Sequence, residues 1–518
     1  TCFRFERGHI VARYELESKR LEAKRTYELE HIFIDDGMTA QSFFEMYTGY
    51  LAATHNIPKR KYTPKGWSSW SCYYNNVDEE KVIRQSELVA KELAPLGADL
   101  IQLDDGWQKD GSFGAYWTTD YDRFPGGMER LKNRLDELGL RFGLWLAPGL
   151  VRDTSEMFDK HSDLLVRDGS GKYGLDKCFG GDDALTGDKN GAIYAFDISK
   201  EEVLEMTAEI FERAKAQYGS EYFKIDFITN LLYRVESGMN IIYPADFATA
   251  AYRRFMQLIR DTVGEDVFLL ACGAPIGESV GIFDSVRISP DISWGGAGKN
   301  GNPEPFEIIM KDAQNIILRS PYHNRVFIND PDALLVRDYL TEYGDDGLIL
   351  SYDEAKLWAT VVLMSGGHII LNEEIDRLPE DRLALVKKTF ELSRRFGDNH
   401  AAARPKRFFE FPYCTESFIP FESEISTEEL FVKMADGYKL GGHGTVICSV
   451  FNWDAVKKNI MFNARDYFEI YDDDTVTSKF IAEEIWTGER FELNDGTLNA
   501  ELPPHSCICI EVKRMSGK

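Results

Sequence analysis

The chain has 518 residues, of which 43% are apolar and 13% aromatic, so it is long enough and apolar enough to bury a sizeable core. Its formal net charge of −26, from 60 basic and 86 acidic side chains, repels phosphate backbones and anionic lipid head groups, which excludes nucleic acid and acidic membranes as partners. No stretch approaches the roughly 18 uninterrupted apolar residues of a membrane-spanning helix, and the 8 cysteines are too sparse for a disulfide framework and show no zinc-type pairing.

The first part of the chain alternates apolar and charged residues at 10–16 and 27–34, which predicts antiparallel strands. Two or three strands are too few for an independent domain, so they need a partner sheet. Residues 37–54 then predict an amphipathic helix. The chain starts at Thr1 without a methionine or signal peptide, so we expect it to begin partway through a longer product. Its compartment stays open, with the cytoplasm favoured.

Residues 63–400 repeat a short apolar strand, a polar loop and a helix. The strands are predicted at 66–70, 100–103, 142–146, 222–226, 268–271, 285–288, 326–328 and 368–371, and the helices at 79–93, 128–138, 200–218, 245–263, 306–318 and 352–364. This alternation predicts an α/β fold, a closed parallel (β/α)8 TIM barrel. An open doubly wound sheet is the rival, but no glycine-rich dinucleotide fingerprint follows the first strand.

Beyond a linking helix at 381–396, residues 401–518 lose this alternation. Runs at 444–451 and 506–512, with turn residues between them, predict a C-terminal antiparallel β-sandwich. We expect it to pack against the barrel and to take no part in chemistry. The Cys507-x-Cys509 pair lies in one of these strands, where both thiols are expected to pack.

The strand at 222–226 carries Lys224 and Asp226 on one face, between the apolar Phe223 and Ile225. Burying a cation and an anion costs several kcal/mol unless both are paired or used. An internal ion pair would explain them without function. A polar loop follows, however, and other predicted strand ends also carry acids, which favours a catalytic carboxylate.

Active sites of TIM barrels lie where the strands end. The polar and aromatic residues at the predicted ends are Trp70, Asp104, Asp105, Trp145, Lys224, Asp226, Cys272, Arg287, Asp291, Asn329, Asp330 and Asp332. Lys224 favours the ionised form of Asp226, which suits a nucleophile. Asp291, beside Pro290 and Trp294, is expected in a less polar setting that keeps it protonated as a general acid. A nucleophile and a general acid are the two groups that cleavage of a glycosidic bond requires at a minimum.

Each of these residues could also have a purely structural role. Asp291 could cap a helix, and Asp226 could pair only with Lys224. Asp104 and Asp105 precede Trp107 and could form an ordinary acidic turn, although carboxylates beside a flat ring also suit a sugar. Metal binding is the other use of paired acids, but the only histidines near these strands are His323 and His368, so no metal is predicted. Trp67, Trp70 and Trp145 could fill the core, as Trp67 is expected to do, and Cys272 could be a packed thiol.

Seven motifs together resemble the retaining α-galactosidases of glycoside hydrolase family 36 in order and spacing. They are GWSSW (66–70), LDDGW (103–107), GLWLAP (143–148), YFKID (222–226), ACGAP (271–275), RISPD (287–291) and INDPD (328–332). The resemblance runs from about residue 15 to the C-terminus. Members of this family usually carry a large N-terminal β-sandwich, so residues 1–62 would hold only its last strands and a connecting helix.

The resemblance implies a role for each site residue. Asp226 would be the nucleophile and Asp291 the acid/base. Asp104 and Asp105 would hold O4 and O6 of galactose, Lys224 the O3/O4 side, and Arg287 with Cys272 the O2 side, while Trp70 and Trp145 would line the pocket. It implies no metal or organic cofactor.

The implied substrate is a neutral oligosaccharide with terminal α-linked galactose, cleaved by double displacement. Activity on α-N-acetylgalactosaminides and galactosyl transfer to sugar acceptors stay open, as does assembly into a homo-oligomer. A sugar-binding protein without activity is the alternative from another class. A decayed enzyme would usually have lost one carboxylate, and here both Asp226 and Asp291 are present.

Overall fold

The computed structural model places most of the chain. It describes residues 2–6, 9–13, 23–24, 26, 32–34, 37–38, 40–58, 62–109, 111, 113–114, 116–167, 191–232, 243, 247–292, 304–342, 349–396, 402–405, 430–435, 445–463, 479–493 and 496–515.

A nine-stranded sheet forms the centre of the molecule, and all its paired strands run parallel. Its strands, in spatial order, are β11 (Ile328–Asp330), β10 (Ser285–Arg287), β9 (Phe268–Ala271), β8 (Tyr222–Ile225), β5 (Arg141–Leu146), β4 (Leu100–Leu103), β3 (Lys65–Ser68), β13 (Ile369–Leu371) and β12 (Ala333–Leu334). The two outermost strands, β11 and β12, are consecutive pieces of one stretch at 328–334, so this stretch joins both edges of the sheet. The closed barrel is confirmed, and the open sheet is excluded.

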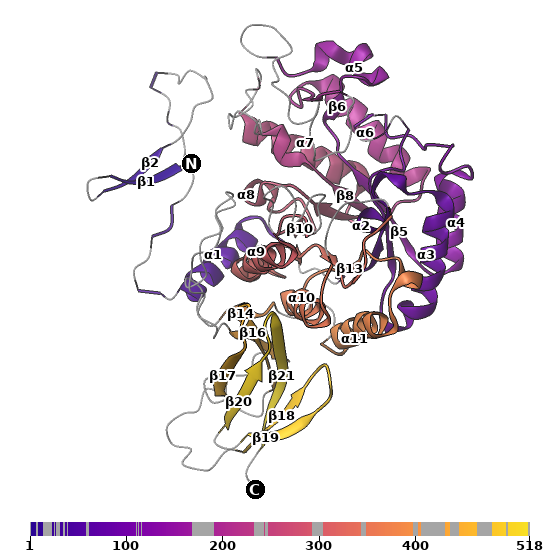
Figure 1. Cartoon of the computed structure of the whole chain (residues 1–518). Coiled ribbons are helices and arrows are strands. Elements are labelled where there is room, and N and C mark those ends of the chain that lie inside the picture. The colour runs from indigo at the N-terminus through magenta and orange to yellow at the C-terminus, as the bar shows by residue number, and fades with distance from the viewer. Residues whose placement is uncertain are drawn as a thin grey trace.

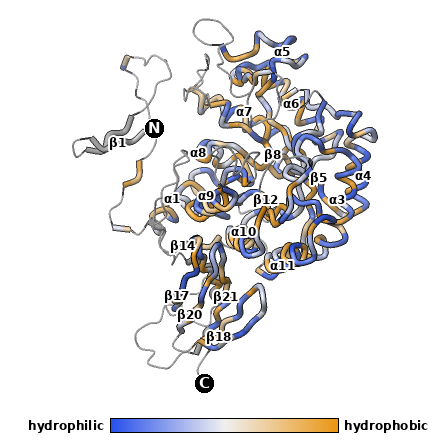
Figure 2. The backbone as a smooth tube through the Cα atoms, viewed as in Figure 1, coloured by the Kyte–Doolittle hydropathy of each residue, from blue (hydrophilic) through white to orange (hydrophobic). Residues whose placement is uncertain are grey.

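Helices surround the barrel strands (Figure 1). They are α3 (Glu79–Glu92), α4 (Gly127–Glu137), α6 (Glu201–Ala216), α7 (Ala248–Val263), α9 (Pro305–Leu318), α10 (Tyr352–Ser365) and α11 (Glu380–Phe396). The sequence sets where they begin: the Asp78 side chain accepts the Lys81 N–H at the start of α3, and Ser351 and Glu354 form a capping box at the start of α10. Apolar and polar residues alternate along these helices, as expected when one face packs on a sheet (Figure 2).

Shorter elements lie between the barrel strands and helices along the chain. They are α2 (Trp70–Tyr73), α5 (Glu156–His161), α8 (Ile276–Ser279) and the antiparallel pair β6 (Leu150–Arg152) and β7 (Ile193–Ala195). The first predicted strand was expected to reach Trp70, but β3 ends at Ser68 and Trp70 begins α2. Among the described residues, no helix has both the length and the apolarity to cross a membrane.

Before the barrel, β1 (Cys2–Glu6) and β2 (His9–Arg13) form an antiparallel pair, followed by α1 (Ala40–Thr54). The strand predicted at 27–34 is not seen at 32–34, and the rest of it lies outside the described residues. The α1 helix contacts the barrel through an ion pair of 3.4 Å between Glu45 and Arg325.

After the barrel, six strands form an antiparallel sheet. In spatial order they are β14 (Arg404–Pro405), β15 (Leu430–Ala435), β16 (Thr445–Asn452), β21 (Ser506–Met515), β18 (Lys479–Glu484) and β19 (Arg490–Leu493). A second antiparallel pair, β17 (Lys458–Asn463) and β20 (Thr497–Leu502), shares a core with it, because Leu502 packs in one apolar cluster with Val450 and Ile510. Cys507 and Cys509 of β21 are buried, which confirms the prediction that they pack.

The C-terminal sheet docks on α10 through polar contacts. The indole N–H of Trp486 donates to Thr360 Oγ1 at 3.0 Å, and His505 Nδ1 lies 2.8 Å from Glu354 Oε1. The expected packing of this region on the barrel is therefore seen.

Gly66 is required by a close approach of β3 to β4. A Cβ at this position would lie 1.9 Å from the Leu100 carbonyl oxygen, which belongs to the backbone and cannot move aside. We predict that Gly66→Ala lowers the free energy of unfolding by about 1–3 kcal/mol or more, as overpacking does. Gly49→Ala is the control, because Gly49 lies in α1 with no atom within 4 Å of an added Cβ. Urea unfolding of both variants checks this, and equal stability of the two would contradict it.

His368 makes stability depend on pH. Its ring is fully buried, its Nδ1 lies 3.8 Å from Asp330 Oδ1, and burial lowers its pKa to about 4. Because the folded pKa is below the unfolded value of about 6.5, the folded protein loses stability as pH falls from 6.5 through 4. The stability difference between the native protein and His368→Gln should therefore shift by up to about 3 kcal/mol against the native protein over that range. A difference that stays constant in urea unfolding at each pH would rule this out.

Candidate active site

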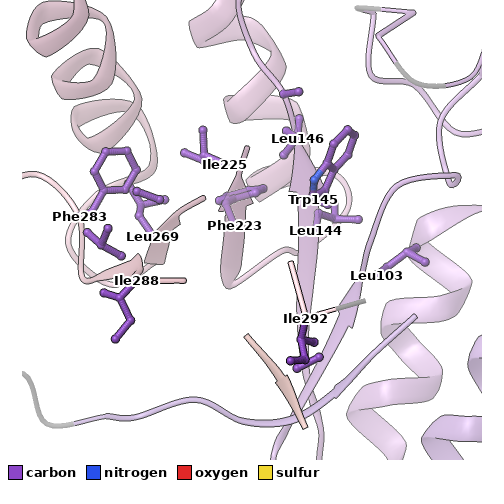
Figure 3. Close-up of a cluster of buried hydrophobic side chains, with 14 of the residues drawn as sticks. Leu103, Leu144, Trp145, Leu146, Phe223, Ile225, Leu269, Phe283, Ile288 and Ile292 are labelled. Carbon is purple, nitrogen blue, oxygen red and sulfur yellow. The ribbon is translucent and has the colours of Figure 1, made fainter. Parts of the chain in front are cut away.

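Side-chain alternation along β8 separates the core from the site. Phe223 and Ile225 belong to the buried apolar cluster between strands and helices, shown in Figure 3. Because successive side chains of a strand point to opposite faces, Lys224 and Asp226 point into the barrel. Lys224 Nζ lies 4.0 Å from Asp226 Oδ2, which confirms that the two charged residues share a face.

Lys224 is paired with Asp104 of the loop after β4. Its Nζ lies 3.0 Å from Asp104 Oδ2, and both side chains are buried. The same oxygen accepts a 2.8 Å hydrogen bond from the amide of Gln102, which also donates to Ser68 Oγ at 3.0 Å. Burial disfavours the ammonium, but the charges of Asp104 and Asp226 outweigh it and hold the Lys224 pKa well above its usual value. Lys224 is therefore a permanent cation at the mouth of the barrel.

Asp226 is held by donors on both carboxylate oxygens. The indole N–H of Trp145 donates to Oδ2 at 3.0 Å, and the backbone N–H of Phe227 donates to Oδ1 at 2.7 Å. Lys224 Nζ lies 4.0 Å from Oδ2. Phe227 adopts a left-handed backbone (φ 56°), and a Cβ on Gly273 would lie 3.2 Å from Oδ1. These donors fix the orientation of the carboxylate, as a nucleophile needs.

Arg287 organises the opposite side of the site. Its guanidinium pairs with Asp291, lies 2.8 Å from Asp332 Oδ1 and lies 3.8 Å from Cys272 Sγ. Burial works against its charge, but Asp332 and Asp291 keep its pKa well above the ordinary value. The Asp291 side chain is 57% exposed, so solvent reaches it, and the described residues do not give it the less polar setting that was expected. The aromatic neighbour expected for Asp291, Trp294, lies outside the described residues.

The buried Cys272 lies between the elements that carry the two carboxylates. Burial raises the pKa of this thiol well above its usual value, and the negative charges of Asp226 and Asp291 raise it further. Arg287 and Lys224 act in the opposite direction on the same thiol. Arg287 Nη1 lies 3.8 Å from Cys272 Sγ and its Nη2 pairs with Asp291, while a Cβ on Gly273 would lie 3.2 Å from Asp226 Oδ1. Asp226, which follows β8, and the Arg287–Asp291 pair, which follows β10, therefore both lie beside the 272–273 segment.

Three further predicted residues take up distinct positions. Asp105 is buried and accepts a hydrogen bond from the Gln108 amide. Trp145 is buried, whereas Trp70 is half-buried with its ring edge-to-face on Tyr74 at 5.1 Å. Trp67, expected in the core, is fully buried there.

Sequence reasoning missed Gln102 and gave no role to Asp332. Gln102 lies two residues before Asp104, so the two-residue period of a strand could have placed both side chains on one face. Nothing in the sequence links Asp332 to Arg287, because the two are 45 positions apart. Within the described ranges, no group of three or more His, Cys, Asp or Glu side chains could hold a metal ion.

The Lys224–Asp104 pair can be tested without any substrate. Removing one buried partner leaves the other charge uncompensated, so Lys224→Met should cost about 3–5 kcal/mol of unfolding free energy. The double variant Lys224→Met/Asp104→Asn should cost less than the sum of the two single changes. A double-mutant cycle by urea denaturation measures this coupling, and strictly additive effects would show that the pair does not interact.

Comparison with known proteins finds a matching family model and several relatives. A family model described as Melibiase matches residues 25–258. Alpha-galactosidase AgaA of Geobacillus stearothermophilus is 32% identical over 152 residues, which are 28% of this chain and 20% of that protein. The chain thus spans about a fifth of the length of the curated relatives it matches.

Solved structures share the fold. The alpha-galactosidase TtGalA of Thermus thermophilus, in complex with stachyose, is 28% identical with a TM-score of 0.52, and the match covers 68% of each chain. A β-L-arabinopyranosidase of glycoside hydrolase family 27 from Geobacillus stearothermophilus has a TM-score of 0.64 over 91% of this chain and 99% of that one. At 17% identity the second similarity concerns the fold alone. Over residues 25–258 the chain is thus similar to the melibiase family, and the relatives it matches include α-galactosidases.

Proposed function

We propose that this chain is a retaining glycoside hydrolase of family 36 that releases terminal, non-reducing α-linked galactose from neutral oligosaccharides. The observation that carries the proposal is that Asp226 and the Arg287–Asp291 pair both lie beside the 272–273 segment, with N–H donors on both oxygens of Asp226. The ordered motifs favour family 36 over family 27.

The reaction follows from these two carboxylates. In the first step, a carboxylate oxygen of Asp226 bonds to the anomeric carbon as the glycosidic C–O bond breaks, and Asp291 gives its proton to the leaving oxygen. In the second step, Asp291 takes a proton from water, whose oxygen bonds to the same carbon and releases Asp226. Two inversions give net retention. The exposure of Asp291 fits its second role, since water must reach it.

The remaining site residues hold the sugar. Asp104 and Asp105 accept hydrogen bonds from its hydroxyl groups, and Lys224 donates from between Asp104 and Asp226. Arg287 and Cys272 face the O2 side and Trp70 lines the pocket. Trp145 lies behind the site and orients Asp226 through its N–H.

The identity of the sugar depends on the space beside O2. Arg287 and Cys272 lie against each other there, which favours a hydroxyl over the larger acetamido group of an N-acetylgalactosaminide. Hydrolysis of p-nitrophenyl α-galactoside, compared with its 2-acetamido analogue, tests this choice. Product analysis with excess sugar acceptor separates hydrolysis from galactosyl transfer.

The two carboxylates should respond differently to substitution. We expect Asp226→Gly and Asp291→Ala each to lower turnover of p-nitrophenyl α-galactoside by several powers of ten, on the order expected for groups that act in the transition state. Added azide should restore activity to Asp226→Gly and give a β-galactosyl azide, because azide replaces the missing nucleophile and inverts the carbon once. Near-normal turnover in either variant would show that the substituted residue does not have its proposed catalytic role.

A further inference from the structure

Arg287 is shared by two carboxylates. One of its terminal nitrogens, Nη2, pairs with Asp291, and the other, Nη1, lies 2.8 Å from Asp332 Oδ1. The arginine is 4% exposed and Asp332 14%, so their attraction is little screened by water. The positive charge of Arg287, which faces Asp291, is therefore largely balanced by Asp332.

The second oxygen of Asp332 reaches the backbone next to Asp291. Asp332 Oδ2 accepts a 2.7 Å hydrogen bond from the N–H of Ile292, the residue that directly follows Asp291. Two more bonds join the same segments, from the Ile288 N–H to the Asp330 carbonyl at 2.9 Å and from Ser289 Oγ to the Pro331 carbonyl at 3.1 Å. The loop that carries Asp291 is thus tied to 330–332 at three points.

The backbone of Asp332 is strained. Its φ of 76° lies in the left-handed region that glycine prefers, and its N–H donates to Asp330 Oδ1 at 3.0 Å, which helps to hold that conformation. Strained residues that persist in a fold are concentrated at functional sites. The strain therefore agrees with a functional demand on where this carboxylate points.

Several carboxyl groups surround Arg287. Asp291 follows β10, Asp330 ends β11, Asp332 follows it, and Asp312 lies buried on α9, next to Lys311. Burial raises the pKa of Asp332 to about 6, against the effect of Arg287 and with that of Asp291 and Asp330, while the Ile292 N–H lowers it. Burial likewise raises the Asp312 pKa well above its usual value, and Asp332 adds to this. Above about pH 6, Asp332 is thus the charged partner that offsets Arg287.

We infer that Asp332 is a positioning residue for the acid/base step, which neutralises Arg287 and anchors the backbone beside Asp291 so that Asp291 keeps the proton it donates. The inference rests on the proposed function. An arginine alone beside a carboxyl group favours its deprotonated form, and a general acid must be protonated to act. Asp332 itself neither gives nor takes a proton in the reaction. It acts only through Arg287 and the Ile292 N–H.

The test is the pH profile of kcat/KM for Asp332→Asn on an α-galactoside. The amide keeps the size of the side chain and removes its charge, so Arg287 acts on Asp291 unopposed. The alkaline limb, which reports loss of the acid's proton, should move toward acid by about one pH unit or more. Turnover should fall more for methyl α-galactoside than for a dinitrophenyl α-galactoside, whose leaving group needs no proton.

Asp284→Asn is a matched control at the opposite end of β10. Asp284 is also a buried carboxylate that pairs with an arginine, Arg260, and accepts a backbone N–H, that of Leu269 at 2.8 Å. Its loss should lower the melting temperature and leave the alkaline limb where it is in the native protein. A limb that moved equally in both variants would show that general loosening, and not the charge of Asp332, is responsible.

Asp332→Gly is the second variant, because glycine adopts the left-handed backbone without strain while removing the carboxylate. It should show the same shift of the alkaline limb as Asp332→Asn. An unmoved limb in folded, active variants would overturn the inference, and so would unfolding of both, since Asp332 would then serve the fold. If the native protein cleaves no α-galactoside, the proposed function fails, independently of Asp332.

Discussion

The site depends on buried cations that are each shared between two carboxylates. Lys224 lies between Asp104 and Asp226, and Arg287 lies between Asp291 and Asp332. A buried charge without a partner costs several kcal/mol, so neither cation could occupy the barrel without its acids. With two acids each, the cations remain charged, and the acids are held in place for a substrate.

Asp226 and Asp291 have different surroundings. Asp226 is fixed by N–H groups of Trp145 and Phe227, one on each carboxylate oxygen. Asp291 is solvent-exposed and faces an arginine that also pairs with Asp332. One end of the barrel thereby holds two aspartates in different surroundings. Under the proposed function, this difference of environment, and not of residue type, separates the nucleophile from the acid/base group.

Closure of the barrel brings these groups together. The 328–334 stretch contributes β11 to one edge of the sheet and β12 to the other, and Asp332 lies between the two strands. The residue that balances Arg287 is therefore located at the point where the barrel closes. Close backbone contacts at Gly66 and Gly367, where an added Cβ would meet a carbonyl oxygen of a neighbouring strand, support the same closure.

The sequence by itself determined the alternation of strands and helices, and with it the barrel, because side-chain periodicity is a local property. It also located Asp104, Lys224, Asp226, Arg287 and Asp291 at strand ends, since charged residues within or directly after short apolar runs are easy to recognise in a sequence. It did not reveal that Trp145 donates to Asp226 or that Asp332 holds Arg287, and it extended the first strand to Trp70, where a helix begins. Only the tertiary structure decided those contacts, because a hydrogen bond between residues 45 or 81 positions apart depends on strand order, register and loop path. None of these leaves a periodic trace in the chain.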